Sequence, residues 1–173
     1  IGSPDETADS IYNGAFDNAS GTASLIELAR AFKSLKVQPK RTIILLAVTA
    51  EEQGLWGSAY YAQNPIYPAE KTVANINIDG VNPFEKTKDI IIIGQGQSEL
   101  EDYLKEAAEK AGRIISYETH PEAGSYYRSD HFNFAKAGIP ALYTSNGVEV
   151  IGKEPGYGQK ADDEYTEKHY HRP

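Results

Sequence analysis

Five acidic or histidine residues stand at points in the sequence where they could bind a metal ion. In chain order they are Asp17, Glu51, Glu52, Asp79 and His171. Each lies at or beside the end of an expected helix or strand, where side chains distant in sequence can converge. Carboxylate oxygens and imidazole nitrogens are ligands that zinc accepts. The set suggests metal-assisted chemistry, although each acid alone could be an ordinary turn or helix-cap residue.

The acidic pair Glu51–Glu52 directly follows a run of six apolar residues, Ile43–Val48. A run of this length, half of it β-branched, predicts a central strand that is buried on both faces by covering helices. Adjacent side chains on an extended or turning backbone point in different directions. One carboxylate of the pair can therefore face a metal ion while its neighbour faces a substrate.

The other segments alternate between helix and strand patterns. Leu25, Leu28 and Phe32 recur at helical spacing after Asp17, and we expect them to pack one helix face over the sheet. This alternation predicts a single α/β domain over residues 1–173, a three-layer α/β/α sandwich around a mostly parallel mixed sheet. Further strands are expected at 73–79, 90–93, 113–117 and 139–143, further helices at 55–63, 98–111 and 129–138, and a long loop at 146–160.

A Gly-x-Gly sequence at Gly94–Gly96 follows one of the expected strands and gives a weak dinucleotide-binding signal. Glu99 occupies the position of the third glycine of that motif, which argues against a nucleotide. Ser98 and Glu101 instead have the spacing of a helix capping box. The local composition is therefore explained without a ligand.

The composition excludes several classes of protein. The net charge is −8 and the isoelectric point is about 5.0, which argues against nucleic acids or anionic membranes as partners. No apolar run is long enough to span a bilayer. Cysteine is absent, so disulfides and thiolate metal ligands are excluded. Methionine is absent too, and we interpret the 173 residues as a piece of a longer protein, trimmed at both ends.

Five motifs between Gly14 and Pro173 carry a resemblance to a known family. They are, in chain order, GAFDNASG, TAEEQGLWGS, NINIDG, RSDHFNFAKAGIPA and KHYHRP. The first two, in this order and at this spacing, are specific, whereas each of the others is weak alone. With these motifs the chain, from Gly14 to His171, resembles the family of zinc exopeptidases that includes double-zinc aminopeptidases, glutamate carboxypeptidases and glutaminyl cyclases.

The resemblance implies a role for each of the five candidates. Asp17 matches the carboxylate that bridges two zinc ions, and Glu51 matches the general base that takes a proton from the bridging water. Glu52 and His171 match the remaining protein ligands of one zinc. Asp79 matches a ligand of the other zinc.

The resemblance also implies roles for three residues outside this set. Tyr170 matches the tyrosine that donates a hydrogen bond to the tetrahedral intermediate. Asp130 and His131 match a segment near the substrate in relatives, and we expect them to contribute to substrate binding. A helix N-terminal cap is a comparable alternative for this pair.

The sequence departs from the family pattern before the first motif. Relatives carry a His-x-Asp motif upstream of the bridging acid, but the first histidine of this chain is His120. One metal position then has Asp17, Glu52 and His171, while the other has only Asp17 and Asp79. We expect two zinc ions in the intact parent, and at most one tightly held by these 173 residues.

The function expected from the resemblance is a zinc-dependent aminopeptidase that removes N-terminal residues from peptides. A glutaminyl cyclase-like acyltransferase and a non-catalytic binding ectodomain remain alternatives. The expected partner is a peptide substrate, and export to the periplasm or to the outside of the cell is expected by analogy with the family alone. The preferred N-terminal residue and the oligomeric state stay open.

Overall fold

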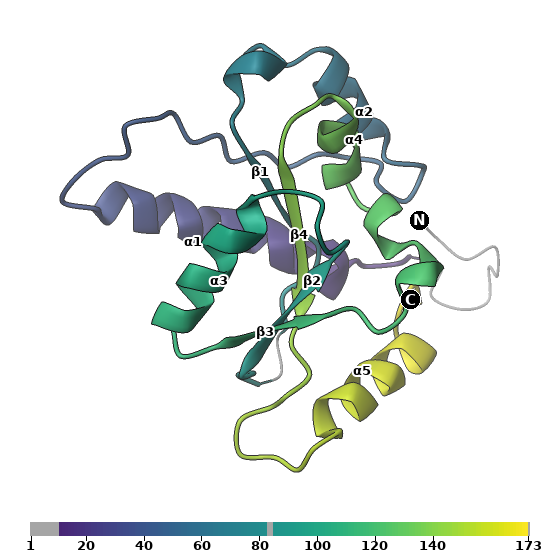
Figure 1. The fold of residues 1–173 in the computed structure, drawn as a ribbon. Coiled ribbons are helices and arrows are strands. Elements are labelled where there is room, and N and C mark those ends of the chain that lie inside the picture. Colours follow the sequence, from purple (N-terminus) through teal and green to yellow (C-terminus); the bar gives the residue numbers. More distant parts are fainter. Residues whose placement is uncertain (1–10, 83–84, 173) are drawn as a thin grey trace.

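Four strands form the sheet in the computed structural model, which describes residues 11–82 and 85–172 (Figure 1). They lie in the order β1-β4-β2-β3. β1 pairs in parallel with β4 and β2 pairs in parallel with β3, whereas β2 and β4 are antiparallel. The predicted mixed, mostly parallel sheet is thus confirmed. The strands are β1 (Asn75–Ile78), β2 (Asp89–Ile93), β3 (Ile114–Tyr117) and β4 (Ala141–Asn146).

Helices surround this sheet, which confirms the predicted α/β fold class (Figure 1). Among the described residues, no helix is long and apolar enough to cross a membrane. The α-helices are α1 (Gly21–Ser34), α2 (Trp56–Gln63), α3 (Leu100–Lys110), α4 (His131–Lys136) and α5 (Tyr157–Lys168), and the short helices are η1 (Ala15–Ser20), η2 (Ala69–Lys71), η3 (Pro121–Ala123) and η4 (Ser125–Tyr127).

The core lies around the two middle strands. Ile92 of β2 is 1% exposed, and Leu142 of β4 is also buried. Ala108 of α3 and Phe134 of α4 supply further buried apolar surface. The strands that form the core are therefore β2 and β4, and Tyr143 of β4 also lines the cleft of the candidate site.

The prediction of a central strand at residues 43–48 is wrong. The segment has no strand assignment, and the four-stranded sheet does not include it. Ile43, Ile44 and Leu45 are 42%, 38% and 39% exposed. An apolar run indicates that a segment can be buried, but a strand also needs a neighbouring backbone to pair with. Within the described residues, no backbone forms strand pairing with this segment.

The predicted packing of α1 over the sheet is also wrong in extent. Only Gly21 of this helix is buried, while Leu25, Leu28 and Phe32 are half-buried. The apolar face of α1 is therefore only partly covered. The helical periodicity itself was read correctly, since α1 forms where it was expected.

The expected loop at 146–160 is shorter than predicted, because α5 begins at Tyr157. This helix was missed because it has no apolar stripe. It carries pairs at i,i+4 spacing, with Lys168 bonded to Glu164 at 2.6 Å and Gln159 bonded to Asp163 at 2.8 Å. Polar helices of this kind give no periodic hydrophobic signal.

The expected capping box at the start of α3 does not form. The buried Glu101 carboxylate accepts hydrogen bonds from the backbone N–H groups of Gly96 (2.6 Å) and Gln97 (3.1 Å). The Ser98 hydroxyl donates instead to the carbonyl of Ala141 at 2.9 Å. The glycine-rich turn therefore binds the protein's own carboxylate, which leaves those N–H groups unavailable to a phosphate.

Candidate metal site

Asp17 lies in η1, immediately before α1, but it does not cap that helix. The neighbouring Asn18 performs this role, because its Oδ1 accepts a hydrogen bond from the N–H of Gly21 at 2.9 Å. The Asp17 carboxylate faces His171 instead. Burial raises the pKa of Asp17, the Glu52 carboxylate raises it further, and His171 opposes the change.

Glu51 and Glu52 lie on a tight turn between Ala50 and Leu55, both of which have positive φ angles. The turn is closed by backbone bonds, because the N–H of Leu55 donates to the carbonyl of Glu51 at 2.8 Å. The N–H of Trp56, which begins α2, donates to the carbonyl of Ala50 at 3.1 Å. The two adjacent carboxylates are thus held on a fixed backbone.

A buried polar network fastens this turn to α4. The Asn133 amide donates to the carbonyl of Leu55 at 3.1 Å and to the hydroxyl of Ser58 at 2.8 Å. Ser58 is fully buried and Asn133 is 5% exposed. These bonds restrain the C-terminal end of the turn. Sequence reasoning did not identify this network, because neither residue carries chemistry of its own.

His171 lies three residues after the end of α5, and its ring faces Asp17 and Glu52. The N–H of Tyr170 donates to the carbonyl of Tyr165 at 3.0 Å, which closes the end of the helix. The His171 ring stacks on the Tyr170 ring, with centroids 3.8 Å apart and planes inclined by 23°. The stacked pair directs the imidazole toward the acidic residues.

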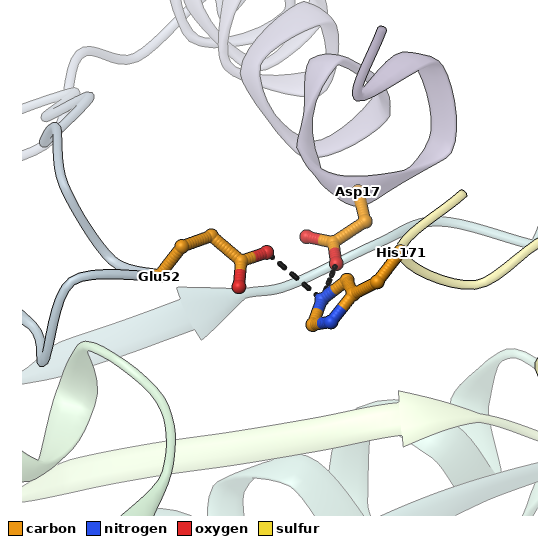
Figure 2. Close-up of side chains that lie close together, drawn as sticks. All are labelled: Asp17, Glu52 and His171. Carbon is orange, nitrogen blue, oxygen red and sulfur yellow. Dashed lines mark ion pairs between the residues drawn. The ribbon is translucent and has the colours of Figure 1, made fainter. Parts of the chain in front are cut away.

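The side chains of Asp17, Glu52 and His171 converge from three distant segments (Figure 2). The Nε2 atom of His171 lies 2.9 Å from Oε1 of Glu52 and 3.3 Å from Oδ2 of Asp17. One ligand atom of each residue lies within 4.8 Å of the other two. Two carboxylate oxygens and one imidazole nitrogen match the donor types and number found at catalytic zinc sites. The residues therefore fit a divalent metal ion.

Asp79 follows β1 and is held by a hydroxyl from another segment. Ser129, which is 2% exposed, donates to Oδ2 of Asp79 at 2.6 Å. The amide of Asn77 in turn donates to the Ser129 oxygen at 2.8 Å. Burial raises the pKa of Asp79, and the bond from Ser129 opposes the change. The sequence analysis did not identify Ser129 as a partner of Asp79, because a serine at the start of an expected helix has no distinctive signal.

A cleft of about 720 Å³ brings most of the predicted site residues together. Its wall includes exposed cations as well as the acids, and Lys136 lies over the ring of Phe132 at 4.9 Å. The predicted site residues that line the cleft are Asp17, Glu51, Glu52, Asp79, Tyr170 and His171, and the other lining residues include Arg128, Phe132, Asn133, Lys136 and Tyr143.

Glu51 has the titration behaviour of a base that works near neutral pH. Burial raises its pKa to about 7, with further contributions from Asp79, Glu52, Asp130 and Asp17. A carboxylate that titrates near the working pH is well placed to accept and return a proton. The surrounding acids that raise this pKa are the same acids that a cation would neutralise.

Tyr170 lines the cleft, and the residue is 42% exposed. Burial raises its pKa to about 12, with contributions from Asp17, Glu52 and Asp79. The hydroxyl is therefore protonated at neutral pH and able to donate a hydrogen bond.

Asp130 and His131, the predicted substrate-binding pair, do not line the cleft. Asp130 occupies the N-cap position of α4 without a side-chain capping bond, and burial raises its pKa. His131 is fully buried between the rings of Tyr126 and Tyr143, each with its centroid 4.7 Å away. His131 is 0% exposed, whereas Asp130 is half-buried and its carboxylate contributes to the raised pKa of Glu51. The role of this pair in substrate binding stays a prediction.

The buried His131 should make the protein less stable at mildly acidic pH. Burial lowers its pKa to about 4, only partly opposed by the backbone of Tyr126. The unfolded chain therefore binds a proton near pH 6.5 that the folded chain excludes. The neutral His131 ring makes its full contribution to the free energy of unfolding above pH 6.5. This contribution, roughly 3 kcal/mol in total, is lost as the pH falls from 6.5 to 4.

Urea unfolding at pH 7.5 and pH 5, followed by circular dichroism, tests this expectation. His131→Phe keeps the ring contacts and should remove this part of the pH dependence. His120→Ala changes a histidine that is 78% exposed and should leave it unchanged. Carboxylates with raised pKa values act in the opposite direction, so the difference between variant and unaltered protein is the quantity to compare. If the stability of His131→Phe depends on pH as strongly as that of the unaltered protein, His131 is not the group responsible.

Comparisons with known proteins identify the family. The sequence profile described as Peptidase family M28 matches residues 4–173. Aminopeptidase YwaD of Bacillus subtilis (strain 168) is 33% identical over 155 residues, which cover 86% of this chain and 32% of the relative. A probable zinc metalloprotease of Pyrenophora tritici-repentis (strain Pt-1C-BFP) is 64% identical over 50 residues, 29% of this chain and 10% of the relative.

Solved structures agree with this match. BSAP, a zinc aminopeptidase from Bacillus subtilis, superposes with a TM-score of 0.61 at 30% identity, covering 84% of this chain and 35% of that chain. The LapA aminopeptidase of Legionella pneumophila has the same fold, with a TM-score of 0.66 at 24% identity over 86% of this chain and 40% of that chain. The 173 residues span about a third of the Bacillus relatives. The chain belongs to peptidase family M28.

Proposed function

We propose that the chain is the metal-binding, catalytic part of a zinc-dependent aminopeptidase, which hydrolyses N-terminal residues from peptides. The observation that supports this most directly is the convergence of Asp17, Glu52 and His171 in the cleft that also contains Glu51 and Asp79. The relatives whose names include zinc and aminopeptidase support the same assignment.

The three converging residues would hold one zinc ion. Zinc supplies a Lewis acid that polarises the scissile carbonyl and lowers the pKa of a bound water. Three protein ligands are the usual number for a catalytic zinc that retains an open position for water or substrate. Asp17 and Asp79 would contribute to a second position, but no imidazole of the described residues joins them.

Glu51 is proposed as the general base. It accepts a proton from the attacking water and returns it to the departing amine, which requires a pKa near the working pH. Its carboxylate lines the same cleft as the metal ligands, and its pKa is about 7 in this structure. Glu52, on the adjacent position of the turn, binds metal instead of exchanging protons.

Tyr170 is proposed to stabilise the oxyanion that develops on the carbonyl. Its protonated hydroxyl can donate a hydrogen bond to that oxygen, an interaction stronger in the transition state than in the bound substrate. The ring is already positioned by stacking on His171. A shift of the Tyr170 ring would therefore also move His171, one of the proposed metal ligands.

The charges that line the cleft suit both ends of a peptide. Asp17, Glu51, Glu52 and Asp79 would attract a free N-terminal ammonium group, to the extent that bound metal leaves them charged. Arg128 and Lys136 of the same wall would attract a carboxylate. The choice of an aminopeptidase therefore rests on the relatives that are named as aminopeptidases.

Zinc titration by calorimetry, with an assay on leucyl-nitroanilide, tests the proposal. We expect one tightly bound zinc per 173-residue chain and slow hydrolysis, since the second metal position has only two carboxylates. Two tight zinc ions with rapid hydrolysis would contradict this count, and no zinc binding would contradict the function. Two further substrates, tested on the full-length protein, distinguish the alternatives. Cyclisation of peptides with N-terminal glutamine would indicate a cyclase, and hydrolysis of unblocked but not acetyl-blocked peptides would indicate an aminopeptidase. Binding of peptides without turnover would indicate a non-catalytic domain.

A further inference from the structure

The side chain of Asn18 connects the two backbone segments that carry the metal-binding acids. Its Nδ2 donates to the carbonyl of Ile78 at 2.9 Å. Its Oδ1 accepts from the N–H of Gly80 at 3.1 Å and from the N–H of Gly21 at 2.9 Å. Because Asn18 follows Asp17, and Ile78 and Gly80 flank Asp79, one carboxamide fixes the positions of both acids relative to each other.

Two further features make this connection rigid. Gly21 approaches so closely that a Cβ atom there would lie within 2.8 Å of the carbonyl oxygen of Ile78 and still closer to the Asn18 carboxamide. The hydroxyl of Ser20 forms a second link, since it accepts from the N–H of Val81 at 2.9 Å and donates to the carbonyl of Phe16 at 2.6 Å. The Asp17 turn and the Asp79 turn are thus joined at two neighbouring points.

We propose that Asn18 is a positioning residue, which holds the carboxylates of Asp17 and Asp79 at the separation that the metal site requires. The inference rests on the proposed metal-binding function and deepens it. Asn18 itself is expected to touch neither metal nor substrate. A carboxamide suits the task because it donates at one end, accepts at the other and carries no charge. A carboxylate there would lose the bond to Ile78 and add negative charge beside two acids.

Asn18→Ala should therefore weaken zinc binding by the chain about 10- to 100-fold, the usual effect of removing a group that orients metal ligands. The loss is expected through Asp17, the ligand next to Asn18, because Asp79 belongs to the second metal position. Asn146→Ala is the matched control. Asn146 also connects distant segments through its side chain, accepting from the N–H of Asn82 at 2.8 Å, and neither residue is adjacent in the sequence to a proposed ligand. It should leave zinc affinity unchanged even if both variants lower the melting temperature equally.

Zinc titration by calorimetry, together with the visible absorption spectrum of Co²⁺-loaded protein, provides readouts that a purely structural role would not change. Asn18→Asp, which keeps the acceptor for Gly21 and Gly80, is the second variant and should also bind zinc more weakly. Zinc affinities and cobalt spectra equal to those of the unaltered protein in a folded Asn18 variant would overturn this inference alone. Failure of the unaltered protein to bind zinc would overturn the proposed function, and this inference with it.

Discussion

Changing Glu51 to glutamine should leave zinc bound and reduce peptide hydrolysis by the full-length protein about 1,000-fold. The amide cannot accept the proton of the attacking water, and general base catalysis typically contributes 10²–10⁴-fold. The substitution keeps the size of the side chain and its place on the Ala50–Leu55 turn. Bound zinc and the rate of leucyl-nitroanilide hydrolysis should be measured on the same preparation.

Glu52→Gln is the matched comparison, because it makes the same chemical change one residue along the same turn. Its Oε1 atom lies 2.9 Å from Nε2 of His171, within the proposed ligand set. We expect this variant to lose zinc together with activity. Equal zinc loss in the Glu51 and Glu52 variants would show that the roles of the two carboxylates are assigned wrongly.

Replacing His171 with alanine should weaken zinc binding by the 173-residue chain at least about 100-fold. This substitution removes a direct ligand, whereas groups that only orient ligands already contribute 10- to 100-fold. His171 supplies the imidazole nitrogen of the converging set, and the remaining donors would be two carboxylates.

His169→Ala tests whether this effect is specific. His169 lies two residues away and its ring is 6.2 Å from that of Tyr165, outside the converging set. A competition titration with a chromogenic chelator should show normal zinc affinity for this variant. If the two histidine variants lose zinc equally, the decisive factor would be the integrity of the C-terminal segment and not a ligand at His171.

The parts of the fold that were predicted well have strong local patterns. The strand at 90–93 and the helix before Ala111 have clear apolar spacing, and β2 and α3 form there. The apolar run at 43–48 was misjudged because burial and strand pairing are decided by neighbours, which a local pattern does not specify. α5 was missed because its stability comes from polar pairs and not from an apolar face.

The candidate ligands could be predicted because carboxylates and a histidine at element ends are visible in the sequence. Local patterns alone do not show their convergence, since Asp17 and His171 are separated by almost the whole chain. The family resemblance is what grouped Asp17, Glu52 and His171 at one metal position. The supporting residues were missed for a different reason. Asn18 and Ser129 have types that are common in turns and helix caps, so that only their bonds to Ile78, Gly80 and Asp79 reveal what they position.

The position of a bound zinc ion is the most direct test of the account. Diffraction data collected on both sides of the zinc absorption edge, from crystals grown with one equivalent of zinc, locate the ion without reference to activity. We predict an anomalous peak bounded by Oδ2 of Asp17, Oε1 of Glu52 and Nε2 of His171, the three atoms that converge in Figure 2. A zinc peak elsewhere on the protein, with none between these three residues, would contradict the central claim.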